Sequence, residues 1–284
     1  MPVTIPEIRA MKKRGEPIAM LTAYDATTAR LLDEAGIPLL LVGDSLGMVV
    51  LGYADTTAVT LEDMLHHTKA VVRGRRRALV VADMPFMSYT VSVERALENA
   101  ARFIRDAGAQ AVKVEGGETI APTIRRLVEA GVPVMAHIGL TPQHVLVQGG
   151  YRVQGRSAPA AEQVLRDALA VEAAGAFSVV LECIPTELAA LVSEALEIPT
   201  IGIGAGPHCD GQVQVIHDLL GAIPDFTPRH AKRYAETAAM LRTAVERYVE
   251  EVRARRFPEA AHGTSMDEAI VRALRERLGT LRGG

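Results

Sequence analysis

Residues 38–48 read PLLLVGDSLGM, an apolar run of strand length that ends abruptly in Asp44 and Ser45. Fully buried parallel strands have this composition, and barrel enzymes carry their chemistry at the carboxyl ends of such strands. The same pattern recurs four times further along the chain. The later runs end in Asp83, Glu115, His137 and Glu182. Five such endings predict that the strand ends meet around a common point.

Segments typical of strands and of helices alternate eight times. The first strand is expected at residues 18–24, followed by a helix over 25–35, and the eighth strand is expected at residues 212–216. Helices that end in glycine just before the next strand are typical of α/β units. The alternation predicts a parallel sheet, either closed or doubly wound. Eight units, with no dinucleotide fingerprint after the first strand, favour a closed (βα)8 TIM barrel.

The domain organisation is expected to be simple. The chain has 284 residues and is 49% hydrophobic, which is enough for one large core. We expect residues 1–284 to form a single (βα)8-barrel domain. Two amphipathic stretches, near 229–255 and 266–281, follow the eighth strand. Residues from about 229 to 284 are therefore expected to form the last barrel helix and a C-terminal helical extension.

Composition and charge limit the classes of function that are possible. The formal net charge is −3, which gives no electrostatic reason to expect nucleic acid or an anionic membrane as a partner. No run of about 18 apolar residues is present, and the N-terminal segment lacks the apolar core of a signal peptide. Cys183 and Cys209 follow no metal or disulfide pattern. We expect both to be reduced thiols of a cytoplasmic protein that acts on small molecules.

Lys113 and Glu115 are two residues apart on one predicted strand, so their side chains share a face. Val112 and Val114 occupy the other face, which should pack on helices. Lys113 and Glu115 are therefore expected to point into the barrel. A buried ion pair that only plugs the barrel is the structural alternative. Such a pair adds little net stability, which favours a functional role.

Asp44, Asp83 and Glu115 end three successive strands. Converging carboxylates repel one another, and their pKa values would rise without a compensating charge. An oxygen-only ligand set favours Mg²⁺, which keeps some of its waters and leaves room for a chelating substrate. The alternative is that individual acids merely cap the helices that follow them.

Three further features are candidates for the site. Glu182 lies away from the acid cluster among apolar neighbours, which suits a general base, although it could instead cap the next helix. His137 is as suited to hydrogen bonding behind the site as to ligation. The glycine-rich segment 202–206 resembles a phosphate cradle, but its bare backbone is better interpreted as room for a bulky ligand at the end of the seventh strand.

The chain resembles the ketopantoate hydroxymethyltransferase family. The resemblance covers roughly residues 18–218 in family order and is highly specific. The matching phrases are TAYD (22–25), LVGDSLG (41–47), ADMPF (82–86), VKVEGG (112–117), HIGLTPQ (137–143), GGYRVQGR (149–156), LEC (181–183) and IGIGAG (201–206).

The resemblance implies a barrel of the phosphoenolpyruvate/pyruvate type with one Mg²⁺ per subunit. The implied reaction transfers a hydroxymethyl group from 5,10-methylenetetrahydrofolate to 3-methyl-2-oxobutanoate in pantothenate synthesis. Carried over by position, the metal residues are Asp44, Asp83 and Glu115, the substrate-binding residues are Asp44, Ser45, Asp83 and Lys113, and the proton acceptor is Glu182. A homodecamer, a pentamer of dimers, is also implied.

Two other function classes remain open from the residues alone. A Mg²⁺-dependent 2-oxo acid lyase or a phosphonopyruvate mutase-type enzyme of the same barrel class would use the same enolate and metal chemistry. A metabolite-binding barrel without catalysis is the third possibility. The converging acids and the inward lysine disfavour it, because a binding protein has no need of either.

Overall fold

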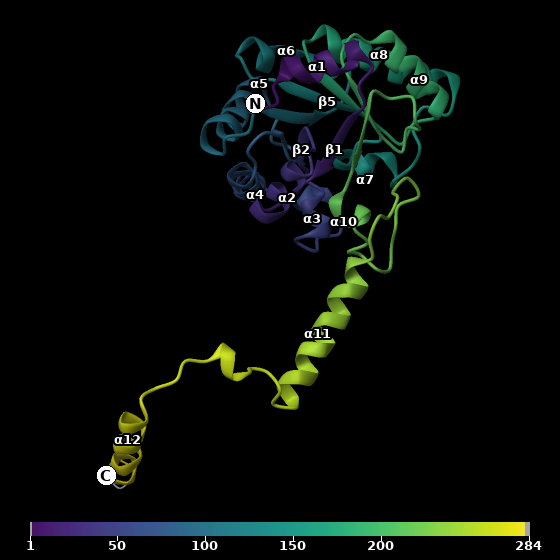
Figure 1. Ribbon diagram of the computed structural model, residues 1–284. Helices are drawn as coiled ribbons and strands as arrows, with labels where there is room; N and C mark the ends of the chain where they lie inside the picture. Colours follow the sequence, from purple (N-terminus) through teal and green to yellow (C-terminus); the bar gives the residue numbers. More distant parts are fainter. Residues whose placement is uncertain (1, 282–284) are drawn as a thin grey trace. The chain divides into compact units, whose positions relative to one another are not determined.

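The computed structural model describes residues 2–281 and contains a closed, fully parallel barrel in the order β1 to β8 (Figure 1). The strands are β1 Ile18–Thr22, β2 Leu39–Val42, β3 Leu79–Asp83, β4 Ala111–Glu115, β5 Val134–Gly139, β6 Ser178–Glu182, β7 Thr200–Ile203 and β8 Gly211–Gln214. The predicted (βα)8 barrel is therefore confirmed, although its eighth strand begins and ends earlier than expected.

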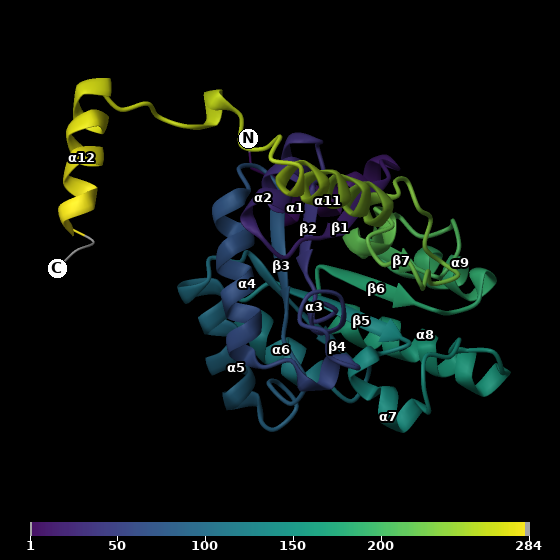
Figure 2. The ribbon, with the colours of Figure 1, turned by 90° about the horizontal axis from the view of Figure 1, so that it is seen from below.

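Helices of different lengths connect and follow the strands. The longer ones are α1 Ile5–Arg14, α2 Ala26–Glu34, α4 Leu61–Gly74, α5 Val93–Ala101, α6 Ala121–Glu129, α8 Ala158–Ala173, α9 Thr186–Ala195, α11 Thr237–Arg253 and α12 Glu268–Leu281. Single helical turns are η1 Thr56–Ala58, α3 Leu46–Val49, η2 Arg102–Asp106, η3 Pro142–His144, α7 Val145–Gln148, α10 Ile216–Leu219 and η4 Ala260–His262. Figure 2 shows α4, α5, α6 and α8 outside the strands.

The barrel has two apolar layers, as the alternation of side chains along its strands requires. One layer fills the interior and includes Met20, Leu41, Val81 and Met135. The other lies between the strands and the surrounding helices. Helix α1, which the sequence analysis did not predict, packs Ile8 into the interior layer, and Thr4 caps its first turn by accepting a hydrogen bond from the Glu7 amide.

The strand register brings the polar strand ends level with one another. Asp83 pairs with Lys113 across β3 and β4, and Glu115 pairs with His137 across β4 and β5. Glu182 pairs with Gly139 across β5 and β6. Neighbouring inward side chains therefore meet at the carboxyl end of the barrel. This register confirms that Lys113 and Glu115 share the inner face.

Local hydrogen bonds determine where the helices begin and how the chain turns from a helix into the next strand. Ser92 caps α5, because its hydroxyl accepts a hydrogen bond from the Arg95 amide at 3.2 Å. Thr60 and Asp63 form a reciprocal capping box at the start of α4. At the end of α2, the buried carboxylate of Asp33 accepts hydrogen bonds from the backbone amides of residues 76–78. These bonds anchor the turn between α4 and β3.

The chain divides into two compact units, residues 1–235 and 236–284. The first unit contains the barrel. In the second, α11 has no buried residue and exposes Met240, Leu241, Val245 and Tyr248. The expectation of one domain that ends in a last barrel helix and an extension stays a prediction. Over the described residues, no helix combines the length and the apolarity needed to cross a membrane.

Candidate active site

A cavity of about 670 Å³ opens at the carboxyl ends of the strands. All seven residues that the sequence analysis selected line it: Asp44, Ser45, Asp83, Lys113, Glu115, His137 and Glu182. They come from the ends of five different strands and were predicted from separate stretches of sequence. The structure therefore brings together the whole predicted set at the position where barrel enzymes carry out their chemistry.

Asp44 and Asp83 are buried beside each other. The backbone amide of Asp44 donates to Asp83 Oδ2 at 3.0 Å. Burial raises the pKa of Asp44 well above its usual value, and the charges of Asp83 and Glu115 raise it further. Burial also raises the pKa of Asp83, although Lys113 and the Asp44 amide oppose this. Without added positive charge, these carboxyl groups resist ionisation.

Lys113 supplies part of that positive charge. Its Nζ lies 3.0 Å from Asp83 Oδ1 and 2.9 Å from His137 Nδ1. Burial would lower the pKa of Lys113, but the charges of Asp83, Glu115 and Asp44 raise it instead. The lysine is therefore a cation, and since an ammonium group has no lone pair, it can only donate to its neighbours.

His137 joins two carboxylates. Its Nδ1 lies 3.4 Å from Glu115 Oε1, and its Nε2 lies 3.1 Å from Glu182 Oε2. Burial and Lys113 would lower the pKa of His137, but Glu115 and Glu182 raise it to about 9. A protonated ring carries a hydrogen on Nε2, and so does a neutral ring whose Nδ1 accepts from Lys113. In both forms Nε2 carries a hydrogen and lies close to Glu182, although it makes no aligned hydrogen bond there.

Glu182 ends β6 and is followed by a backbone feature common at functional sites. Cys183 has a φ of 47°, which a non-glycine residue adopts uncommonly and at a cost of about 1–3 kcal/mol. Glu182 does not cap the next helix, since α9 begins at Thr186, after Pro185 as its N-cap residue, and has no side-chain cap. The capping alternative therefore fails for this residue, and its carboxylate faces the cavity.

Gln143 is a site residue to which the sequence analysis gave no role, although it stands in the HIGLTPQ phrase. Its Nε2 donates to Asp44 Oδ2 at 2.8 Å and to the Met84 carbonyl at 2.9 Å. Its backbone amide donates to Glu115 Oε2 at 3.0 Å, and its Oε1 accepts from the Tyr89 hydroxyl. A buried amide so placed holds two acids in position. No pattern in the sequence separates such a residue from any other loop glutamine.

The donor set suits a hard divalent cation. Among the described residues, no three carboxylate, imidazole or thiol side chains lie close enough to form a ready-made metal site. However, Asp83 Oδ1 and Glu115 Oε1 are buried without an aligned hydrogen bond. At the strand ends, the carboxyl groups of Asp44, Asp83, Glu115 and Glu182 also outnumber the cationic groups, which are Lys113 and a protonated His137. Oxygen ligands and excess negative charge are what Mg²⁺ requires.

The glycines after β7 allow other side chains to approach the backbone closely. A Cβ on Gly204 would lie 3.1 Å from Cys183 Sγ and 3.3 Å from His230 Cβ, and the residue has a φ of +66°. A Cβ on Gly206 would clash with Thr186 at 2.5 Å. Both glycines also line the cavity described next, and the interpretation of this segment as room for a ligand stays a prediction.

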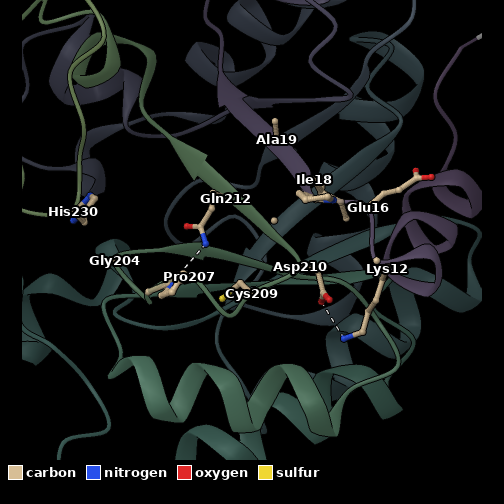
Figure 3. Close-up of a pocket in the computed structure, with 14 residues that line it drawn as sticks. Lys12, Glu16, Ile18, Ala19, Gly204, Pro207, Cys209, Asp210, Gln212 and His230 are labelled. Carbon is tan, nitrogen blue, oxygen red and sulfur yellow. Dashed lines mark hydrogen bonds and ion pairs between the residues drawn. The ribbon is translucent and has the colours of Figure 1, made fainter.

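A second cavity, of about 880 Å³, lies against the end of α1 and strands β1 and β8 (Figure 3). Its charged groups are already paired, since Lys12 Nζ contacts Asp210 Oδ2 at 3.0 Å and donates to the Ser193 carbonyl. Gln212 Nε2 donates to the carbonyl of Gly206 at 2.9 Å. None of the seven selected residues lines this cavity, so the candidate active site is the first one.

The fold and the cavity together define a (βα)8 barrel with a polar site at the carboxyl ends of its strands. Solved structures with this fold include a 2,3-dimethylmalate lyase, a member of the PEP mutase/isocitrate lyase superfamily, with a TM-score of 0.57, 18% identity and complete coverage of both chains. A phosphonopyruvate hydrolase in complex with oxalate and Mg²⁺ has a TM-score of 0.59 and 15% identity, covering 100% of this chain and 99% of that one. Identities this low establish the fold alone.

Sequence similarity then defines the family. The model of the ketopantoate hydroxymethyltransferase family matches residues 2–260. A 3-methyl-2-oxobutanoate hydroxymethyltransferase of Roseiflexus sp. (strain RS-1) is 60% identical over 275 residues, which cover 97% of this chain and 99% of that protein. The enzyme of that name from Dehalococcoides mccartyi is 54% identical over 276 residues, with 97% and 98% coverage. The chain belongs to the ketopantoate hydroxymethyltransferase family.

Proposed function

We propose that this protein transfers a one-carbon unit from 5,10-methylenetetrahydrofolate to 3-methyl-2-oxobutanoate. With one water consumed, the products are 2-dehydropantoate and tetrahydrofolate, in the pathway to pantothenate. The family membership supports the reaction. The single observation that carries the mechanism is the contact between Glu182 and His137 across the cavity from Asp44 and Asp83.

The carboxylates suited to hold Mg²⁺ are those of Asp44, Asp83 and Glu115. The cation, when bound, would polarise the keto group of the oxo acid and favour enolate formation. Lys113 places its ammonium group beside Asp83, where it stabilises negative charge on the substrate oxygens. Ser45 lines the same side of the cavity and offers a hydroxyl donor. These residues orient the oxo acid.

Glu182 is the group that removes the proton from C3 of the oxo acid. Its Oε2 lies 3.1 Å from His137 Nε2, so the imidazole ring lies beside one carboxylate oxygen and the other oxygen can accept a proton. The methylene carbon of the folate is bound to two nitrogens, and one water hydrolyses both carbon–nitrogen bonds, giving formaldehyde and tetrahydrofolate whose two nitrogens take up the two protons of the water. The enolate carbon attacks the formaldehyde carbon and a carbon–carbon bond forms. The π electron pair of the formaldehyde carbonyl moves to its oxygen, which takes the proton held by Glu182 and becomes the new hydroxyl group.

The competing candidate is a 2-oxo acid lyase or mutase of the same barrel class. Its support is limited to fold similarity at 15–18% identity, whereas hydroxymethyltransferases are 54–60% identical to this chain. A metabolite-binding barrel would not need the buried base and lysine. We therefore favour hydroxymethyl transfer over both.

We also propose a homodecamer that works in the cytoplasm. Helix α11 exposes large apolar side chains, among them Met240 and Tyr248, which a partner surface would cover. Both cysteines are free thiols, which suits a reducing compartment. Self-association and two small-molecule substrates are the partners this function requires.

The decisive experiment is a product assay on the purified protein. Incubation with 3-methyl-2-oxobutanoate, 5,10-methylenetetrahydrofolate and Mg²⁺ should release 2-dehydropantoate, detected by mass spectrometry. Omission of the folate should abolish product formation. If instead the protein cleaves a carbon–carbon or carbon–phosphorus bond of a substituted 2-oxo acid and forms no 2-dehydropantoate, the lyase or mutase assignment replaces this one.

A further inference from the structure

The active-site cavity is larger than the oxo acid requires, and its two parts differ in chemistry. The part described above has carboxylates, Lys113 and His137. The other part is lined by β8, α10 and the segment that follows, and it includes Gln214, Val215, Asp218 and Phe226. These residues all lie within the first unit, and none has a role in proton removal. A single five-carbon acid would leave this second part empty.

Two hydrogen-bond acceptors in the second part have no partner. Gln214 Oε1 is buried and makes no hydrogen bond within the described chain. Asp218 is 9% exposed, and no hydrogen bond or ion pair joins its carboxylate to another described residue. Burial raises the pKa of Asp218, while His230 and Arg233 oppose this. A buried acceptor without a partner, such as Gln214 Oε1, costs free energy, and the Asp218 carboxylate lines the cavity with no hydrogen bond to the described chain. Both groups therefore suit a ligand that donates N–H groups.

The oxo acid cannot be this ligand. Its carboxylate and keto oxygens are acceptors only, and they would face Asp218 and Gln214 Oε1 with like polarity. The second part instead requires a molecule with adjacent N–H donors. Ile223, Phe226 and Pro228 supply apolar and aromatic surface on which a flat ring can stack. Arg152 and Arg229 also line the cavity, and both are exposed, as suits contacts with carboxylates near solvent.

We infer that the β8–α10 side of the cavity is the subsite for the one-carbon donor, with Asp218 binding the amino-pyrimidinone edge of the pterin. This inference rests on the proposed function. The pterin edge presents a ring N–H next to an amino group, a pair of donors that matches the two oxygens of one carboxylate. Gln214 accepts a further N–H from the same ring system. The ring stacks beside Phe226, and the glutamate tail reaches Arg152 and Arg229.

Asp218→Asn tests the assignment with little risk to folding, because the side chain makes no bond that the fold needs. The variant should bind tetrahydrofolate, and use 5,10-methylenetetrahydrofolate, about 10- to 100-fold more weakly, the usual effect of losing a charge-assisted pair of hydrogen bonds. Its folate-independent exchange of the C3 proton of the oxo acid into D₂O should match the wild type. Asp225→Asn is the matched control, since Asp225 is exposed on the same segment and does not line the cavity.

Fragments separate the pterin contact from the tail contact. In competition binding, Asp218→Asn should weaken a reduced pterin without its tail and leave p-aminobenzoylglutamate unaffected, whereas Arg229→Gln should do the reverse. Wild-type affinity of Asp218→Asn for tetrahydrofolate would overturn the inference. Equal loss of folate binding and of proton exchange would also overturn it, because Asp218 would then belong to the oxo acid side. A wild-type protein that binds tetrahydrofolate but forms no product would refute the proposed function, and the binding comparison would still decide the subsite.

Discussion

Gln143 Nε2 donates a hydrogen bond to Asp44 Oδ2 at 2.8 Å and so joins the turn after β5 to the end of β2. The same side chain accepts from Tyr89, and its backbone amide donates to Glu115. Two of the three proposed metal-binding acids are therefore held by one residue outside the metal site. Acids that repel one another need such fixed donors to stay in place while the site is empty.

We predict that Gln143→Leu, which keeps the volume and removes every side-chain hydrogen bond, weakens oxo acid binding and slows C3 proton exchange at least tenfold. It should also lower the free energy of unfolding by about 1–3 kcal/mol, because the buried Asp44 loses its side-chain donor and Tyr89 loses one of its hydrogen bonds. Isothermal titration with the oxo acid and urea unfolding measure the two effects. Gln148→Leu is the control, since that amide bonds only to Thr141. Normal exchange by Gln143→Leu would show that Asp44 needs no such support.

Glu182→Gln should bind 3-methyl-2-oxobutanoate nearly normally and lose the exchange of its C3 proton. The amide keeps the shape of the side chain but cannot accept the proton, so the rate should fall by about 10²–10⁴-fold. NMR of C3 in D₂O, with Mg²⁺ and no folate, measures this directly. Asp44→Asn should also lose the proton exchange, but its affinity for the oxo acid should fall as well. Exchange by Glu182→Gln at the wild-type rate would move the base to His137 or to a metal-bound hydroxide.

Removal of divalent cations should abolish both turnover and proton exchange, and added Mg²⁺ should restore them. The physical reason is that four carboxyl groups at the strand ends, those of Asp44, Asp83, Glu115 and Glu182, outnumber Lys113 and His137. Asp83→Ala should lose metal-dependent binding of the oxo acid while its circular dichroism spectrum stays that of the wild type. Full activity after exhaustive chelation, verified by elemental analysis, is the result that excludes the metal.

Asp33 should make folding stability depend on pH. Burial would raise its pKa, but hydrogen bonds from the amides of Ala78, Arg77 and Arg76 lower it below its usual value. An acid with a depressed folded pKa stabilises the fold fully above its unfolded pKa, near 3.9, and loses that contribution as the pH falls through the folded pKa. Asp33→Asn should therefore cost about 1–3 kcal/mol at pH 7 and progressively less in acid. Urea unfolding at several pH values tests this, with the exposed neighbour Glu34→Gln expected to change little.

The protein should form an assembly larger than a dimer. The apolar residues of α11 are exposed, and helices with such a face need a surface to cover it. Multi-angle light scattering at assay concentration should give a mass of several chains. A stable species at the 30.4 kDa of one chain would contradict the prediction. Deletion of the residues after Phe257 tests separately whether the tail contributes.

The positions of the main site residues could be predicted from the order of residues along the chain. Apolar runs that end in Asp44, Asp83, Glu115, His137 and Glu182 place these groups at the carboxyl ends of parallel strands, because a strand buried on both faces needs a polar stop at its end. The two-residue period likewise predicts that Lys113 and Glu115 point inward. Such patterns are local, and local periodicity is enough to identify them.

What the sequence could not indicate depends on contacts between distant segments. Gln143 and Asp44 are 99 positions apart, and only closure of the barrel brings the amide to the carboxylate. The close approach of His230 to the bare backbone of Gly204 likewise joins residues 26 positions apart. Whether the Asp218 carboxylate has a hydrogen-bond partner is likewise decided by the side chains that surround it. Hydrogen bonding and packing act over a few ångströms in space, so they appear only when the chain is folded.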